Sequence, residues 1–224
     1  MKIFNGFSGI GGNRTLWGNE HEITACDTNE ERLEIYHQRF PNDEIEEQDA
    51  YQYYEDHYQE FDLAWFSPPC PTHSKLRLMN QNKKLIPDMK LYGLIIFCQY
   101  FCPGKYVIEN VQGYYNPLIT PNSTISRHYW WTNIKIPFKE FPIPKQFNTK
   151  RTYIANNGKT FTRNRGHREM PLKQLYKFKQ VDPILLQNYS GNKTKLLRDC
   201  VDPRVGKYIL DCILGKPQGL SKFL

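Results

Sequence analysis

Several features are scarce or missing in this sequence of 224 residues, and each absence excludes a class of protein. No apolar run reaches the roughly 18 residues of a membrane helix, and the opening MKIFNGFSG does not resemble a secretory signal. Thiols stay reduced in the cytosol, so the six cysteines are expected to be free, and because no two of them form a CxxC pair no metal site is expected. We expect a cytoplasmic protein, encoded by a bacterium or a phage.

Positive charge, by contrast, is abundant. Lys and Arg number 30 against 23 Asp and Glu, which gives a formal net charge of +7 and a pI near 9.0. Such an excess favours an anionic partner, usually nucleic acid, although a basic surface without a specific partner is about as common. The aromatic content of 14% can supply both a core and surfaces for base stacking.

Short apolar segments alternate with helical patterns through the first half of the chain. Strands are predicted at 1–7, 22–27, 44–50, 61–67 and 105–111, and helices at 29–40, 51–58 and 89–101. This alternation is typical of an α/β fold, in which a parallel sheet is connected by crossover helices.

The second half is organised differently. A strand is predicted at 127–136, and the following stretch is rich in Lys, Arg, Asn and Pro with weak periodicity, as expected for an insertion of loops and short strands. A helix is predicted at 205–214, with Asp202-Pro203 marking its start. We therefore expect a main domain at 1–136, a basic segment at 137–190, and a C-terminal helical region at 191–224 that returns to the main domain.

Three segments at predicted strand ends have the composition of a nucleotide site. FSGIGG, from Phe7 to Gly12, lets the backbone turn sharply and approach a ligand, but such turns are common, and alone this motif leaves ligand binding about even. Asp27 follows the second strand, where a nucleotide-binding sheet places a carboxylate on ribose hydroxyls. Asp49 follows the third strand and could accept the adenine amine. Each acid could instead cap a helix, but two in register favour a ligand.

Two further strand ends carry reactive groups. SPPCPTHS follows the fourth strand, where open α/β sheets bind ligands, and its prolines restrict the backbone around Cys70. A thiol placed there can act as a nucleophile, with an inert buried cysteine as the alternative. IENV places Glu109 at the end of the next strand, where it could act as an acid or hydrogen-bond a ring nitrogen, or merely cap a turn. Neighbouring strand ends with a thiol and a carboxyl group indicate a catalytic site.

Together these motifs resemble those of the cytosine carbon-5 DNA methyltransferases, and they occur in the order of that family. FSGIGG, ACDTNE and EQDA resemble its cofactor motifs, FDLAWFSPPCPTHS its catalytic motif, IENV its glutamate motif and LLRDCVDPRVGKYIL its last motif. The resemblance covers residues 1–134 and resumes near 190. It implies a Rossmann-like S-adenosylmethionine-dependent methyltransferase fold with a small basic target-recognition insertion.

The resemblance also implies roles for single residues. Cys70 would be the covalent nucleophile and Glu109 the partner of the cytosine ring. Arg127 is the candidate for the arginine that holds the cytosine, with His128 as the alternative, and Arg127 could equally be an ordinary surface residue. The residues expected to bind S-adenosylmethionine are Phe7, Ser8, Gly9, Ile10, Gly11, Gly12, Asp27, Thr28, Asp49, Ala50, Pro69 and Cys200.

Three departures from the family pattern stand out. Pro71 replaces a glutamine, Arg198-Asp199 replaces Gly-Asn, and SRHYWWTN replaces the Gln-x-Arg-x-Arg strand. The segment 137–190 interleaves basic with aromatic residues, which suits nucleic acid, although a solvated loop is the alternative. The residues in question are Lys145, Lys150, Arg151, Lys159, Arg163, Arg165, His167 and Arg168 with Phe147, Tyr153 and Phe161.

The expected partner is double-stranded DNA, methylated at a flipped-out cytosine by a monomeric enzyme. The same chemistry on tRNA or on a free cytosine nucleotide is one alternative, because the recognition segment is short. Methylation of an exocyclic amine and a catalytically inactive nucleic-acid-binding relative are two others.

Overall fold

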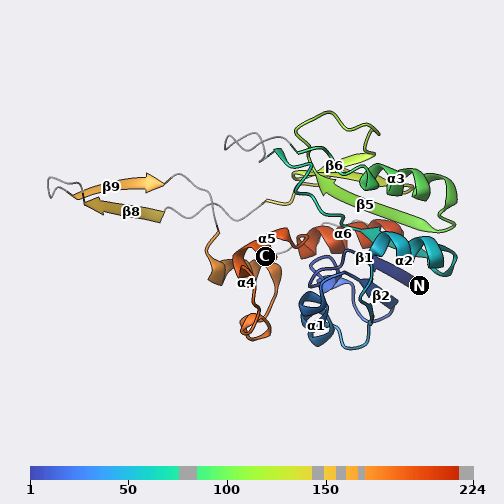
Figure 1. Cartoon of the computed structure of the whole chain (residues 1–224), viewed down its shortest axis with the longest axis horizontal. Coiled ribbons are helices and arrows are strands. Elements are labelled where there is room, and N and C mark those ends of the chain that lie inside the picture. Colours follow the sequence, from blue (N-terminus) through green and yellow to red (C-terminus); the bar gives the residue numbers. More distant parts are fainter. Residues whose placement is uncertain (76–84, 143–148, 155–159, 166–169, 217–224) are drawn as a thin grey trace. The chain divides into compact units, whose positions relative to one another are not determined.

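The computed structural model describes residues 1–75, 85–142, 149–154, 160–165 and 170–216. The chain divides into two compact units (Figure 1). Unit 1 comprises residues 1–141 and 200–224, and unit 2 comprises residues 142–199. Each unit is described by itself.

A seven-stranded sheet forms the centre of unit 1, in the order β3-β2-β1-β4-β5-β7-β6. Its strands are β1 (Lys2–Gly6), β2 (Glu22–Cys26), β3 (Glu44–Glu46), β4 (Leu63–Phe66), β5 (Lys105–Val111), β6 (Ser123–Ile125) and β7 (His128–Thr132). The first five pair in parallel, whereas β7 is antiparallel to both β5 and β6. The parallel α/β architecture predicted from the alternating pattern is confirmed.

Helices cover both faces of this sheet because its central strands are apolar on both sides. Successive strand residues point to opposite faces, so Phe4 and Ile108 belong to one buried cluster and Ile3 and Val107 to the other. The first cluster includes residues of α2 (Ala50–His57) and α3 (Lys90–Phe101), and the second includes residues of α6 (Pro203–Ile213).

Two helix starts lie where the sequence predicts them. Asn29 caps α1 (Glu30–Arg39) by accepting the backbone N–H of Arg32 on its side chain. Asp202 caps α6 in the same way, and Pro203 occupies its first turn, where the missing N–H carries no cost. The glycine turn is followed by a 3-10 turn, η1 (Arg14–Leu16). No helix among the described residues is long and apolar enough to cross a membrane.

Unit 2 combines an antiparallel hairpin of β8 (Thr149–Ile154) and β9 (Thr160–Arg165) with α4 (Leu172–Lys179), the 3-10 turn η4 (Pro183–Leu186) and α5 (Lys193–Asp199). Strands were expected in this part of the chain, but α4 was not. Its sequence, LKQLYKFK, offers a single fully buried hydrophobe, Leu175, among lysines and half-buried aromatics. Leu172, Leu175 and Tyr176 follow helical spacing, but a helix of eight residues is shorter than the stretch over which such a pattern distinguishes a helix.

Candidate active site

The predicted site segments leave the sheet at one edge. Gly6, the last residue of β1, pairs with Cys26 at the end of β2 and with Phe66 at the end of β4. Phe66 in turn pairs with Ile108 of β5, so Glu109 is the next residue at that edge. The carboxyl ends of neighbouring parallel strands therefore bring the glycine turn, Asp27, the SPPC segment and Glu109 to one side of unit 1, where open α/β sheets bind ligands.

The glycine turn after β1 is built around an open position. Gly9 has φ of 52°, a left-handed conformation, and a Cβ atom placed there would meet no atom of the described residues within 4 Å. The Oγ of Ser8 is buried without a hydrogen-bond partner in the described part of the chain. Phe7 also has a positive φ of 56°, a conformation that costs a bulky residue about 1 kcal/mol or more. An unpaired hydroxyl beside open backbone is what a polar ligand would satisfy.

The end of the turn is filled by protein rather than left for a ligand. A Cβ on Gly12 would lie 2.8 Å from the Cβ of Cys200 and 2.8 Å from the carbonyl oxygen of Val201. A Cβ atom on Gly206 of α6 would lie 2.4 Å from the carbonyl oxygen of Asn13. The C-terminal segment thus packs directly on the glycine turn, with Cys200 next to Gly12.

The two candidate acids are held differently. The carboxylate of Asp27 is buried and accepts the backbone N–H of Gly9 at 2.9 Å and that of Asn29 at 3.0 Å, so it joins the glycine turn to the start of α1. Asp49 caps α2, accepting the N–H of Tyr51 at 3.0 Å, and also forms an exposed ion pair with Lys90 at 3.2 Å. Asp27 therefore lies within the turn itself, whereas Asp49 has the capping contact expected of a structural residue.

The remaining predicted cofactor residues are divided between core and surface. The side chains of Ile10 and Ala50 are buried, with 0% and 1% of their surface exposed. Thr28 and Pro69 are exposed. Phe7 is half-buried, its ring 4.8 Å from that of Tyr51 in an edge-on arrangement.

Cys70 lies in a loop that is fixed to the end of β5. The backbone N–H groups of His73 and Ser74 donate to the carbonyl of Cys70 at 3.0 and 3.1 Å, forming a tight turn. Before the cysteine, the Asn110 side chain donates to the carbonyl of Pro68 at 3.1 Å in a buried contact. The asparagine next to Glu109 in the chain thus holds the segment that carries Cys70.

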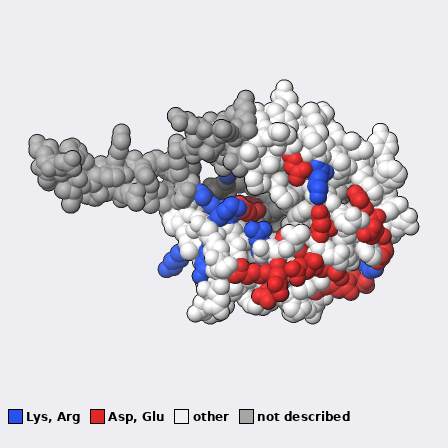
Figure 2. Space-filling model, in the orientation of Figure 1, with Lys and Arg blue, Asp and Glu red and all other residues white. Residues whose placement is uncertain are grey.

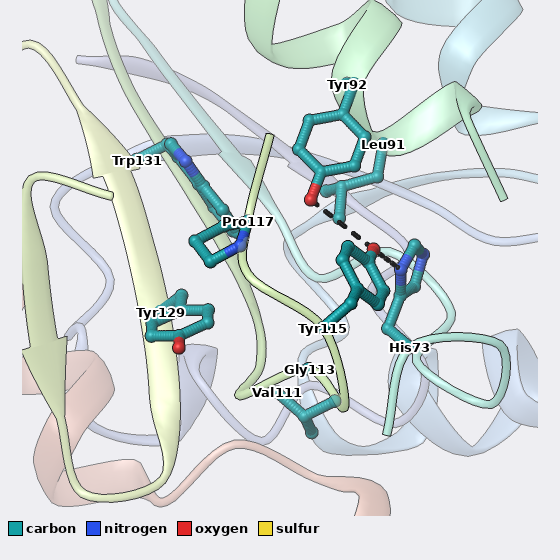
Figure 3. Close-up of a pocket in the computed structure, with 9 residues that line it drawn as sticks. All are labelled: His73, Leu91, Tyr92, Val111, Gly113, Tyr115, Pro117, Tyr129 and Trp131. Carbon is teal, nitrogen blue, oxygen red and sulfur yellow. Dashed lines mark hydrogen bonds between the residues drawn. The ribbon is translucent and has the colours of Figure 1, made fainter. Parts of the chain in front are cut away.

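A buried histidine in the same loop, His73, makes a second set of contacts that hold it in place. His73 is 2% exposed, and its Nδ1 lies 2.6 Å from the hydroxyl of Tyr115, which the hydroxyl of Tyr92 reaches at 3.4 Å (Figure 3). Burial lowers the pKa of His73, although Asp88 opposes the shift. The loop that carries Cys70 is thereby joined to α3, through Tyr92, and to the segment after β5. His73 lies inside SPPCPTHS and Asn110 inside IENV, but neither position shows these contacts in the sequence alone.

Glu109 is 9% exposed and lies near His128, with 3.8 Å between its Oε2 and the Nε2 of the histidine. Arg127 is exposed at the turn between β6 and β7, and its carbonyl accepts the N–H of Gln112 at 3.0 Å. Of the two candidates for holding the cytosine, His128 thus lies next to Glu109, and Arg127 lies in the exposed turn.

The structure describes only some of the predicted recognition residues. Lys145, Phe147, Lys159, His167 and Arg168 lie outside the described residues. For β8 and β9 the structure describes the backbone alone. No cluster of three or more metal-binding side chains occurs among the residues that the structure does describe.

Comparison with known proteins identifies a family and a fold. A family model described as C-5 cytosine-specific DNA methylase matches residues 1–124. Among solved structures, the Entamoeba histolytica methyltransferase EhMeth is 14% identical with a TM-score of 0.53, over 96% of this chain and 98% of that one. A DNMT2 variant from Spodoptera frugiperda is 24% identical with a TM-score of 0.40, over 64% of this chain and 55% of that one. The chain therefore spans about half the length of that variant. No curated protein matches.

Proposed function

Since this chain belongs to the family of C-5 cytosine-specific DNA methylases, with S-adenosylmethionine as cofactor and the Rossmann-like methyltransferase fold, we propose that it methylates carbon 5 of a cytosine in double-stranded DNA. The observation that carries the proposal is the pairing of β4 with β5, which brings the Cys70 loop and Glu109 to one edge of the sheet. The contact from Asn110 to Pro68 joins these two segments directly.

The residues of the glycine turn fit an adenosine-bearing cofactor. Gly9 leaves its surroundings open, and the unpaired hydroxyl of Ser8 offers a hydrogen bond beside it. Each carboxylate oxygen of Asp27 accepts one backbone N–H and keeps a lone pair with which it could accept a ribose hydroxyl. Phe7, held at a positive φ, would supply the aromatic surface for the adenine ring.

Cys70 is the proposed nucleophile, because carbon 5 of cytosine is too weak a nucleophile by itself. The thiolate sulfur of Cys70 forms a bond to carbon 6, and the electron pair of the C5=C6 bond moves to carbon 5. Carbon 5 uses this pair to take the methyl group from the sulfonium sulfur of the cofactor, which keeps the electrons of the broken bond and leaves as a neutral thioether. A base then removes the proton of carbon 5, the C5=C6 bond re-forms, and the thiolate of Cys70 leaves.

Glu109 would act on the ring nitrogen next to this reaction. Negative charge spreads to ring nitrogen 3 as sulfur adds to carbon 6, and a carboxyl group that hydrogen-bonds or protonates that nitrogen stabilises it. The near-complete burial of Glu109 strengthens this contact, because little water competes with it. In a duplex the base must first be flipped out of the stack, since neither face of its ring is otherwise accessible.

Target recognition is assigned to the basic segment at 137–190, most of which belongs to unit 2. Unit 2 contains 13 Lys and Arg but three Asp and Glu, so its formal charge is +10. Contacts from such a segment to phosphates supply affinity and orient the substrate, without needing the fixed geometry of the catalytic groups.

Replacing the nucleophile tests the chemical step. We expect Cys70→Ala to lower kcat by more than about 10⁴-fold while binding of S-adenosylmethionine is unchanged. DNA that contains 5-fluorocytosine should trap wild-type protein as a denaturation-resistant complex, because fluorine does not leave carbon 5 as a proton does. Cys70→Ala should form no such complex. A variant that kept near-normal activity would contradict the covalent mechanism.

A substrate comparison tests the choice of DNA. Random-sequence duplex DNA, tRNA and dCMP are each incubated with methyl-labelled S-adenosylmethionine, and base-resolved mapping locates 5-methylcytosine. Labelling of the duplex supports the proposal, whereas labelling confined to tRNA or dCMP moves the same chemistry to that substrate. Methylation of the exocyclic amine would overturn the assignment of the reaction.

A further inference from the structure

The strand pairing around Glu109 distinguishes between Arg127 and His128, the two residues that could bind the cytosine together with it. In the antiparallel pair of β5 and β7, Glu109 lies opposite Trp130 and Val111 lies opposite His128. Side chains alternate between faces along a strand, so His128 shares a face with Glu109. Arg127, one residue earlier, lies outside the strand, exposed in the turn between β6 and β7. The strand register therefore places His128, and not the turn residue Arg127, on the face of Glu109.

Distances and burial agree with this assignment. The Nε2 of His128 lies 3.8 Å from the Oε2 of Glu109, too long for a direct hydrogen bond but close enough for both groups to reach one ligand. The side chain of Glu109 is 12% exposed and that of His128 is 39% exposed. The pair thus has a buried end and an end open to solvent, from which a ligand could approach.

We propose that His128, and not Arg127, holds the target cytosine together with Glu109. This inference rests on the proposed function. Charge that develops on cytosine spreads over ring nitrogen 3 and the adjacent carbonyl oxygen. Glu109 would take the nitrogen, and the protonated imidazole of His128, beside it on the same face, donates a hydrogen bond to the oxygen.

A histidine in this role makes the reaction depend on pH in a way that an arginine does not. An imidazole loses its charge within about pH 5 to 8, whereas a guanidinium keeps its charge throughout. The residues paired with His128 across the sheet are Val111 on β5 and Ile125 on β6, both uncharged, and among the described residues Glu109 is the charged group in contact with it. The pH profile of the rate should therefore differ between the wild type and His128→Arg.

Three variants test the assignment, with kcat and KM for duplex DNA measured across that pH range and above it. His128→Gln should lower kcat about 100-fold with a smaller change in KM, because a donor aimed at developing charge is lost. His128→Arg should retain activity, and its pH profile should differ from that of the wild type. Arg127→Gln, the matched control one residue away, should stay within about twofold of wild type, as for a surface residue outside the site.

Unchanged binding of S-adenosylmethionine shows that each variant is folded. Loss of activity in Arg127→Gln with near-normal activity in His128→Gln would overturn the inference, as would identical pH profiles of the wild type and His128→Arg. The two proposals fail separately. A wild-type protein that forms no 5-methylcytosine contradicts the proposed function, whereas an active protein indifferent to His128→Gln contradicts the role of His128 alone.

Discussion

The two units of this chain differ in net charge. Unit 1 carries 17 Lys and Arg and 20 Asp and Glu, a formal charge of −3, whereas unit 2 carries +10 in 58 residues. Figure 2 shows acidic side chains gathered over the part of unit 1 that α1 and α2 form. The net positive charge of the whole chain therefore comes from unit 2, and the composition of the full sequence conceals the negative net charge of unit 1.

This difference reflects two kinds of requirement. The candidate catalytic groups must be held in place by packed elements, and unit 1 holds them with parallel strands, a buried asparagine contact and a tight turn. Attraction of a polyanion depends on the density of positive charge and tolerates movement of single side chains. Substitutions in unit 1 should thus alter stability or turnover, and substitutions in unit 2 should alter affinity and its dependence on salt.

The largest stability effect is expected from a buried ion pair beneath the glycine turn. The guanidinium of Arg14 donates to the carboxylate of Asp43 at 2.8 and 3.1 Å, both side chains are 3% exposed, and the hydroxyl of Tyr36 donates to Asp43 at 2.7 Å. Asp43→Asn leaves the guanidinium buried without a counter-charge. We expect the free energy of unfolding to fall by about 3–5 kcal/mol in urea titrations followed by tryptophan fluorescence.

All four tryptophans, Trp17, Trp65, Trp130 and Trp131, belong to unit 1, so this signal reports on that unit. The matched control is Glu60→Gln, which removes the exposed pairs with Lys2 and His57, and its effect on the free energy of unfolding should be small beside that of Asp43→Asn. Equal effects of the two substitutions would show that unit 1 does not depend on its buried charges as proposed.

The order of elements and the strand-end motifs could be predicted from the sequence, since both are encoded locally. The alternation of short apolar segments with helical patterns predicted the parallel strands, and the end of the second predicted strand gave the position of Asp27. The contacts that hold the Cys70 loop could not be predicted, because Asn110 and Pro68 meet only when β5 pairs beside β4. The choice between Arg127 and His128 likewise depends on strand register, which adjacent letters of the sequence do not reveal.

A middle-sized effect is expected where α6 approaches the glycine turn. In Gly206→Ala, the new Cβ would lie 2.4 Å from the carbonyl oxygen of Asn13 and 2.8 Å from its Cα, and backbone atoms cannot move away as a flexible side chain can. We expect a loss of about 1–3 kcal/mol in the same urea titration. Weaker binding of S-adenosylmethionine should accompany it, because this contact supports the turn.

Gly93 provides the opposite case. It lies in α3, is exposed, and a Cβ there would meet no atom of the described residues within 4 Å. Gly93→Ala should therefore stabilise unit 1 by about 0.5–1 kcal/mol, the usual gain from alanine within a helix. If both alanine variants shifted stability in the same direction, close packing of α6 on the turn would not explain the glycine at 206.

The smallest effect, and the one that tests unit 2 directly, concerns two exposed lysines one turn apart on α4. Lys173→Gln with Lys177→Gln removes two positive charges without touching the buried Leu175. If both contact phosphates, the slope of log affinity for duplex DNA against log salt should decrease by about 1.8, at about 0.9 per contact. The unfolding free energy measured by tryptophan fluorescence should not change.

The matched control removes two exposed lysines of unit 1, Lys2 and Lys216, and its salt slope should equal that of the wild type. Equal slopes for both double variants would mean that DNA responds to the total charge of the chain, and the division of labour between the units would then be wrong.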